Sequence, residues 1–264
     1  MFGRLLKNTL EEAGIDSEEL HVDPKVRTTL AFVHTMPDGD REFSFYRDPG
    51  ADMMLTEEEI EDSFIQSARI FHFGTLSMTH DGIRGATKKA VNAAKENGCL
   101  VSFDPNLRLP LWESMELAKE QMEYGFAQCD ILKISDNEIR FATGKDDYDE
   151  GIAILQDRYH IPLILLTMGK DGSRAYYKDL RVEQKGFEVK TIETTGAGDT
   201  FYGCSLGYLL DHDINHLTKE NLEEMLTFAN AGAAIVTTKK GAIRSMPERE
   251  AICGLIRTRQ KTEA

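Results

Sequence analysis

The sequence lacks any apolar run that approaches the roughly 20 residues needed to cross a bilayer. Its first residues, MFGRLLKNTLEEAG, are charged and amphipathic, unlike a secretory signal peptide. It has only four cysteines, none of them in a C-x-x-C pair or in a Cys/His cluster with zinc spacing. These absences disfavour a membrane-spanning protein, a disulfide scaffold and a structural zinc domain. We therefore expect a cytoplasmic protein whose thiols are reduced and buried.

Positive charge is also scarce. The chain has 31 Lys and Arg residues against 45 Asp and Glu residues, a formal net charge of −14. Such a surface repels nucleic acids and anionic membranes, so we expect neither as a partner. It also repels anionic substrates, so an enzyme of this composition that handles phosphates needs a local positive potential or a metal ion.

What the chain does have, after residue 68, is a series of short apolar runs that alternate with helical patterns. Strands are expected at 70–73, 100–103, 131–134 and 163–166. Helices are expected at 2–13, 83–94, 114–127, 198–211 and 221–237. This alternation predicts an α/β fold with a doubly wound, mostly parallel sheet that is covered by helices on both faces.

Residues 27–47 differ from the rest and predict a β-hairpin that stands off the main sheet. Two β-rich stretches flank a turn signal at Pro37–Asp40. A two-stranded hairpin is marginal in water, so Phe32, Phe43 and Phe45 need cover. We expect the hairpin of a second subunit to provide that cover, which makes the protein a homodimer; the alternative is packing on the chain's own body.

The run Thr194–Phe201 contains Gly196-Ala197-Gly198-Asp199 directly before a helical pattern. Small residues let a ligand approach the backbone, and the first N–H groups of a helix form an anion site. A carboxylate inside an anion site is electrostatically unfavourable unless it acts there, and Asp199 is placed to take a proton from an attacking hydroxyl. The alternative is that Asp199 only complements the helix dipole.

Polar residues follow three of the predicted strands. The segment Thr167–Gly172 has glycines suited to wrapping a nucleotide phosphate, or forms a simple turn. The segment Asp104–Arg108 ends in a guanidinium suited to phosphate, or forms an Asx-type turn. The segment Ser135–Glu138 is a capping box, or Glu138 holds water on Mg²⁺. We expect these loops to meet at one edge of the sheet.

Together these motifs resemble the PfkB (ribokinase-like) family of carbohydrate kinases. The resemblance implies a ribokinase-like three-layer αβα fold, with 27–47 as a small β lid over the sugar. It implies that Asp199 is the catalytic base and that Gly196, Ala197 and Gly198 form the anion hole. Glu138 then corresponds to the glutamate of the family's N-x-x-E motif, with Ser135 in place of the usual Asn, and holds Mg²⁺ through water.

The resemblance also assigns further contacts to ATP, the sugar and a monovalent cation. The nucleotide contacts it implies are Thr167, Gly169, Lys170, Gly172, Lys133, Asn230 and Gly241. The sugar contacts are Asp104, Asn106, Arg108, Phe45 and Asp199. The potassium site is formed by Glu193, Thr195, Val236, Lys239, Gly241 and Ser245, with Glu193 in place of the family's usual Asp.

Within the family, segments 41–47, 50–52 and 104–111 are most similar to fructokinases. This implies ATP-dependent phosphorylation of fructose at O6, with ribose, 2-keto-3-deoxygluconate or a nucleoside as alternative substrates. A catalytically inactive nucleotide-binding protein is the alternative from another class. Residues 1–264 match the family as one domain, but only from a point after its opening strand and Gly-Gly loop. We therefore expect a strand–helix–strand unit of at least about 30 residues to be missing in front.

Overall fold

The computed structural model describes residues 1–35 and 41–263, so the turn expected at 37–40 lies outside the described residues. Its helices are α1 (Phe2–Glu12), α2 (Asp62–Gln66), α3 (Asp81–Glu96), α4 (Met115–Gln128), α5 (Asp136–Thr143), α6 (Tyr148–Tyr159), α7 (Ala197–Leu210), α8 (Lys219–Val236) and α9 (Arg249–Glu263). Its strands are β1 (Leu30–Thr35), β2 (Arg41–Tyr46), β3 (Ile70–Gly74), β4 (Leu100–Asp104), β5 (Ile131–Ser135), β6 (Leu163–Thr167), β7 (Ser173–Tyr177) and β8 (Leu180–Gln184).

The main sheet has six strands in the described part of the chain, in the order β3-β4-β5-β6-β7-β8. Pairing is parallel from β3 to β6 and antiparallel for β7 and β8. The mostly parallel sheet expected from the sequence is confirmed. The strands β7 and β8 and the helices α2, α6 and α9 were not expected.

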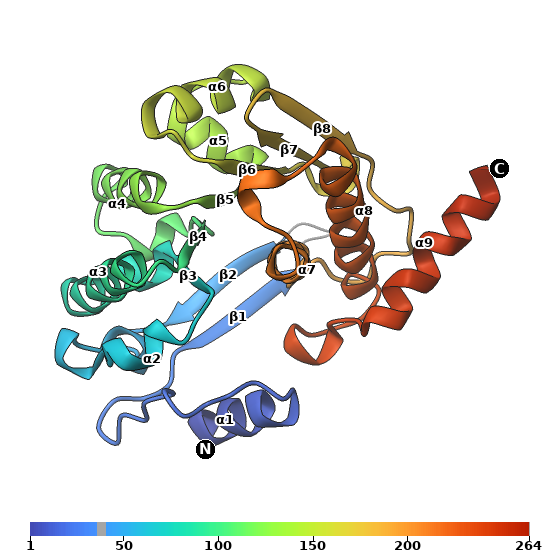
Figure 1. The fold of residues 1–264 in the computed structure, drawn as a ribbon. Helices are drawn as coiled ribbons and strands as arrows, with labels where there is room; N and C mark the ends of the chain where they lie inside the picture. Colours follow the sequence, from blue (N-terminus) through green and yellow to red (C-terminus); the bar gives the residue numbers. More distant parts are fainter. Residues whose placement is uncertain (36–40, 264) are drawn as a thin grey trace.

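Helices cover both faces of this sheet (Figure 1). On one face, side chains from α3, α4, α5 and α6 pack against residues such as Phe103, Leu132 and Ile164. On the other face, α7 and α8 pack against residues such as Ile131 and Leu163. Neighbouring residues of a strand therefore enter different cores, as the two-residue period of a strand requires.

The same alternation directs two charged side chains to the α7 face. In β5, Leu132 and Ile134 belong to the core under α3–α6, so Lys133 lies on the opposite side of the sheet. In β4, Phe103 likewise belongs to that core, so Asp104 also faces α7. Phe103 is paired with Leu132 across the sheet, which places Asp104 and Lys133 at the next position of the register.

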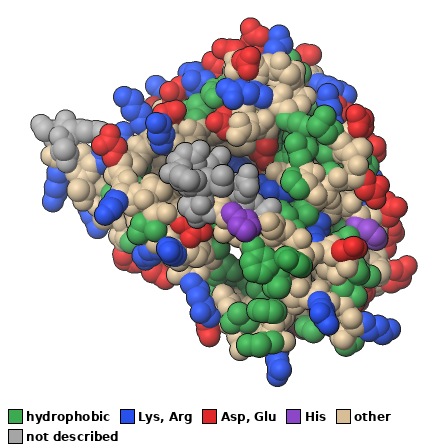
Figure 2. Space-filling view, turned by 180° about the vertical axis from the view of Figure 1, so that it is seen from behind, with side chains coloured by type: hydrophobic (Ala, Val, Ile, Leu, Met, Phe, Trp, Pro, Cys, Tyr) green, Lys and Arg blue, Asp and Glu red, His purple; other side chains and the backbone are tan. Residues whose placement is uncertain are grey.

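The β1–β2 hairpin forms a separate two-stranded antiparallel sheet, as expected. Its Phe32 and Tyr46 rings meet edge to face at 5.5 Å, and they remain 49% and 71% exposed. The side chain of Phe43 lies outside the described ones. Helix α1 also exposes apolar side chains, and hydrophobic side chains gather low on the face shown in Figure 2.

Within residues 1–35 and 41–263, no helix combines the length and the apolar character that crossing a bilayer requires.

Candidate active site

The carboxyl ends of β4, β5 and β6 and the start of α7 surround a cavity of ≈ 460 Å³. The residues singled out from the sequence that line it are Asp104, Asn106, Arg108, Lys133, Glu138, Thr167, Gly169, Gly172, Thr195, Gly196, Ala197, Gly198, Asp199 and Asn230. The structure therefore brings together motifs that are spread over more than a hundred residues of the chain. Their meeting follows from the rule that parallel strands present their carboxyl ends at one edge of the sheet.

The glycine-rich run forms the turn into α7. Gly196, the N-cap residue, has φ +80° and ψ 0°, a left-handed conformation that side chains disfavour. The N–H of Ala197 donates to the carbonyl oxygen of Thr194 at 3.2 Å. The N–H groups of Gly198 and Asp199 belong to the first helical turn, where no intrahelical acceptor exists. These two groups direct the positive end of the helix dipole toward the cavity, an arrangement suited to an anion that makes them the candidate anion site.

A buried ion pair lies beneath this anion site. The Lys133 Nζ atom donates to both carboxylate oxygens of Asp104, at 3.1 and 3.0 Å. Both side chains are almost fully buried, with 7% and 6% of their surface exposed. A Cβ atom on Gly198 would lie 3.3 Å from the Lys133 Nζ atom, so the ammonium supports the turn directly.

Burial and charge act on this pair in opposite directions. Burial raises the pKa of Asp104 to about 6, although the Lys133 ammonium opposes this rise. Burial also disfavours the charged form of Lys133, but the carboxylates of Asp104 and Glu138 outweigh it, so the pKa of Lys133 lies above its ordinary value. Lys133 is therefore charged at neutral pH, and its charge is largely balanced by Asp104.

Glu138 occupies the third residue of α5 and forms the capping box that the sequence predicts. Its Oε2 atom accepts from the N–H of Ser135 at 2.9 Å and from the Ser135 hydroxyl at 2.8 Å. Its Oε1 atom accepts the N–H of Leu107 at 2.8 Å. A carboxylate has about four acceptor positions, so one position remains for a metal-bound water. The donor set thus fits the outer-sphere magnesium role implied by the family resemblance.

The loop after β6 has the glycine conformations that a nucleotide loop needs. Gly169 and Gly172 have φ values of +56° and +105°, and Gly172 is packed so tightly that an added Cβ would lie 2.1 Å from the carbonyl oxygen of Gln184. Asn230 stands behind this loop. Its side-chain oxygen accepts a hydrogen bond from the Ser173 hydroxyl at 2.9 Å, and its side-chain nitrogen donates to the carbonyl oxygen of Gln184 at 3.0 Å. Asn230 therefore stabilises the wall of the cavity.

The residues assigned to a monovalent cation lie in the loop before α7 and in the end of α8 with the loop that follows it, and these segments touch each other beside the anion site. The Thr195 hydroxyl donates to Glu193 Oε1 at 2.5 Å, and the N–H of Gly241 donates to Glu193 Oε2 at 3.4 Å. The hydroxyl of Ser245, which is 1% exposed, donates to the carbonyl oxygen of Lys240 at 2.8 Å. Carboxylate and carbonyl oxygens suit a hard cation, so this donor set fits the expected site.

Some predicted site residues do not line the cavity, and some lining residues were given no individual role in the sequence analysis. The predicted residues outside it are Phe45, Lys170, Glu193, Val236, Lys239, Gly241 and Ser245. The additional lining residues are Ser135, Asp136, Asn137, Thr194, Phe201 and Ala233. Asp136 and Asn137 follow directly after β5, and the strand-end rule that identified Glu138 points to them as well.

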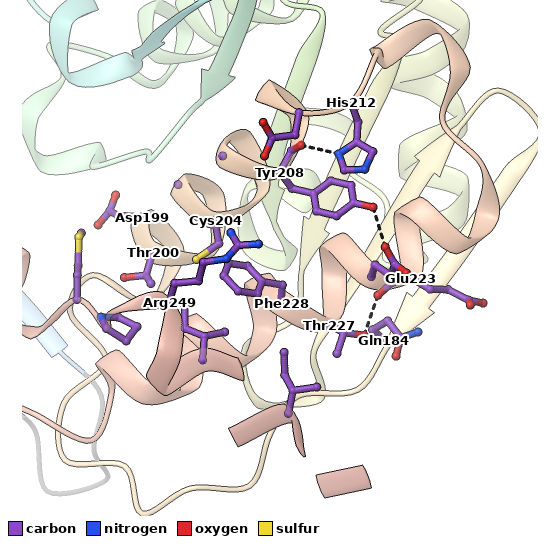
Figure 3. Close-up of a pocket in the computed structure, with 18 of the residues that line it drawn as sticks. Gln184, Asp199, Thr200, Cys204, Tyr208, His212, Glu223, Thr227, Phe228 and Arg249 are labelled. Atoms are coloured by element: carbon purple, nitrogen blue, oxygen red, sulfur yellow. Dashed lines mark hydrogen bonds between the residues drawn. The ribbon is translucent and has the colours of Figure 1, made fainter. Parts of the chain in front are cut away.

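A larger cavity of ≈ 850 Å³ lies between α7, α8 and α9 (Figure 3). Its lining includes Phe228 and Ile252, and in Figure 3 Asp199 lies on one side of this pocket and His212, Glu223 and Gln184 on the other. Among the described residues, Asp199 lines both cavities. The smaller cavity contains the anion site and Arg108, so it is the one equipped to hold phosphates.

Comparison with known proteins agrees with this site. A sequence profile of the pfkB family carbohydrate kinases matches residues 1–249. Fructokinase-2 of Solanum lycopersicum is 43% identical over 246 residues, which are 93% of this chain and 75% of that protein. Fructokinase-2 of Zea mays is 42% identical over 246 residues, which are 93% of this chain and 73% of that protein.

Solved structures show the same likeness. The Vibrio cholerae O395 fructokinase with fructose, ADP and calcium bound superposes with a TM-score of 0.89 at 32% identity, covering 97% of this chain and 82% of that one. The Xylella fastidiosa fructokinase with bound ATP gives a TM-score of 0.87 at 29% identity, covering 98% and 83%. With its converging motifs, its fold and these relatives, the chain belongs to the pfkB family of carbohydrate kinases.

Proposed function

We propose that this protein transfers the γ-phosphoryl group of ATP to fructose and forms fructose 6-phosphate. The observation that carries the proposal is the position of Asp199 beside the anion site at the start of α7, in one cavity with Arg108. The choice of fructose rests on the relatives, which are fructokinases at 42–43% identity, and on the Vibrio cholerae structure with fructose and ADP bound.

In this mechanism, Asp199 accepts the proton of the attacking fructose hydroxyl. The hydroxyl oxygen then forms a bond to the γ-phosphorus, and the bond from that phosphorus to the bridging oxygen breaks to release ADP. The N–H groups of Gly198 and Asp199 stabilise the charge on the transferring phosphoryl oxygens. Arg108 adds a cation that can contact phosphate oxygens in a bidentate manner.

Mg²⁺ fits the same site through Glu138. Glu138 would hold Mg²⁺ through water, and the bound ion would supply positive charge that offsets the charge of the ATP phosphates. Among the described residues, no cluster of His, Cys, Asp and Glu side chains is arranged to hold a metal ion by itself. This supports a magnesium ion held by the nucleotide and by water, with Glu138 accepting a hydrogen bond from one such water. Potassium at the Glu193 site would add positive potential beside the anion site.

A coupled assay of ADP release with fructose, ribose, 2-keto-3-deoxygluconate and a nucleoside tests the proposal. Fructose is expected to give the highest kcat/KM, and a different best substrate would replace it within the same mechanism. The variant Asp199→Asn keeps the shape of the side chain but not the base, so its rate should fall about 10²–10⁴-fold. Sugar-dependent ADP release at the wild-type rate by this variant would refute the role of Asp199. ATP binding without turnover of any sugar would instead indicate the inactive nucleotide-binding protein.

We also propose that the β1–β2 hairpin is a lid over the sugar and that two hairpins pair in a homodimer. The exposed Phe32 and Tyr46 supply the apolar surface that a partner would cover. Light scattering at micromolar concentration tests this, with a monomer counting against it. The thiols of Cys99, Cys129, Cys204 and Cys253 are free, which supports a reducing compartment such as the cytoplasm.

A further inference from the structure

The carboxylate of Glu138 does more than complete a helix cap. The capping box of α5 uses one oxygen of Glu138, because Oε2 accepts both the N–H and the hydroxyl of Ser135. Oε1 instead reaches a backbone N–H that lies 31 residues earlier in the chain, at 2.8 Å. Glu138 is 7% exposed, so this bond is shielded from water and from competition by it.

The bond to Leu107 completes a series of attachments along the loop after β4. The Asp104 side chain is held by Lys133, and the Pro105 carbonyl oxygen accepts the N–H of Thr75 at 3.2 Å. The N–H of Asn106, which has φ +44°, donates to Asp104 Oδ1 at 3.1 Å. Each residue from 104 to 107 is therefore held by at least one hydrogen bond or ion pair. Arg108 directly follows this fixed segment.

Arg108 depends on this arrangement because its side chain is hydrogen-bonded to the same residue, Leu107. Its Nη1 atom donates to the carbonyl oxygen of Leu107 at 3.0 Å, while the Leu107 N–H donates to Glu138. If Glu138 released Leu107, a partly buried N–H would lose its acceptor, which is unfavourable in the protein interior. The loop would relax to satisfy it, and the guanidinium would move with the loop.

We propose that Glu138 is a positioning residue, whose carboxylate latches the loop 104–108 through the Leu107 N–H and thereby aims Arg108 at the phosphate site. The proposal rests on the proposed kinase function. It predicts a role for Glu138 that does not require the carboxylate to touch the metal ion or its water. Displacement of a phosphate-binding group by about 1 Å can reduce a rate about 10²-fold, so a latch of this kind matters for catalysis.

The test compares Glu138→Gln with Glu150→Gln. Glu150 is a matched control, because it occupies the same third position of α6, behind the cap residue Asp147, and its carboxylate is 62% exposed in an ion pair with Lys145. Glu138→Asp is a second variant, which keeps the charge but is one methylene too short to reach both partners. The readouts are hydrogen exchange of the backbone N–H groups in 105–110, which belong to residues 106–109 because 105 and 110 are prolines, kcat and KM for ATP, and the Mg²⁺ concentration for half-maximal rate.

We expect both Glu138 variants to exchange the 105–110 segment at least about tenfold faster, which corresponds to a loss of about 1.4 kcal/mol in local stability. We expect kcat/KM for ATP to fall about 10–100-fold even at saturating Mg²⁺. Glu150→Gln should change none of these. Because the latch acts through Arg108, adding Glu138→Gln to Arg108→Ala should cause little further loss.

Two outcomes would overturn the latch. One is unchanged exchange in 105–110 with a higher Mg²⁺ requirement, which would make Glu138 a metal-side residue only. The other is a double variant whose kcat/KM for ATP falls by the product of the two factors measured for Glu138→Gln and Arg108→Ala separately. If the wild-type chain phosphorylates none of the sugars, the proposed function fails, whereas the exchange measurement still decides whether Glu138 holds the loop.

Discussion

Replacing Lys133 by methionine tests how much the buried ion pair under the anion site contributes. Methionine has nearly the length of lysine but no charge, so the change removes two contacts, at 3.1 and 3.0 Å, from the Asp104 carboxylate. The Asp104 side chain is only 6% exposed and would be left without its cation. Removing one partner of a buried pair typically costs about 3–5 kcal/mol.

The pKa of Asp104 limits this loss. Burial already raises that pKa to about 6 in the presence of Lys133. Without the ammonium it should rise further, so the carboxyl group takes up a proton at neutral pH instead of remaining charged. We therefore expect the lower end of the range, about 3 kcal/mol. For a domain of this size that corresponds to a decrease of roughly 6–12 °C in Tm.

Thermal unfolding followed by circular dichroism at pH 7.5 and pH 5.5 provides the assay. The decrease in Tm caused by Lys133→Met should be smaller at pH 5.5, where Asp104 protonates readily. The double variant Lys133→Met with Asp104→Asn removes both charges and keeps an acceptor for the Asn106 N–H, so it should regain at least about 1 kcal/mol. Activity should not return. A Tm equal to wild type for Lys133→Met at pH 7.5, or a double variant no more stable than the single one, would refute the reasoning.

Three further predictions concern pH, a glycine and potassium. The pKa of Asp104 is raised to about 6, so lowering the pH through that value protonates its carboxylate and breaks its ion pair with Lys133. A plot of kcat/KM against pH should therefore fall on the acid side, and Asp104→Asn should abolish this acid-side decrease. Gly172→Ala would place a Cβ 2.1 Å from the carbonyl oxygen of Gln184, so it should lower Tm and raise KM for ATP. Both effects should be well beyond those of the control Gly144→Ala, because Gly144 also has a positive φ, +70°, but an added Cβ there would meet no described atom within 4 Å. Potassium should raise kcat relative to a large organic cation, and Glu193→Ala should remove that difference; equal rates in both salts for the wild type would exclude the cation site.

Local sequence was sufficient for the elements whose signal is local. The apolar runs at 70–73, 100–103, 131–134 and 163–166 all became strands of the main sheet, because a parallel strand covered on both faces must be apolar throughout. The structure contains the capping box predicted at Ser135–Glu138, because both of its hydrogen bonds lie within one helical turn. The glycine-rich turn likewise precedes a helix, with Gly196 in the conformation that only its residue type adopts freely.

The missed elements had weaker signals. The strand β8 (Leu180–Gln184) alternates apolar and polar residues, and a two-residue turn at 178–179 joins it to β7 (Ser173–Tyr177), whose first two residues are polar. That period-2 pattern predicts a hairpin, but it lacks the continuous apolar run by which the other strands were recognised. Helix α9 has few apolar residues, and it is held by tertiary contacts such as those of Ile252 in the core.

The sequence by itself determined which chemical groups the protein carries and, through strand alternation and the carboxyl-end rule, on which edge of the sheet they stand. Only the tertiary structure decided how they pair. Asp104 meets Lys133 across 29 residues and Leu107 meets Glu138 across 31. Such contacts depend on the register of neighbouring strands and on how closely α5 and α7 approach the sheet. These are set by the packing of the whole core, which no local pattern encodes.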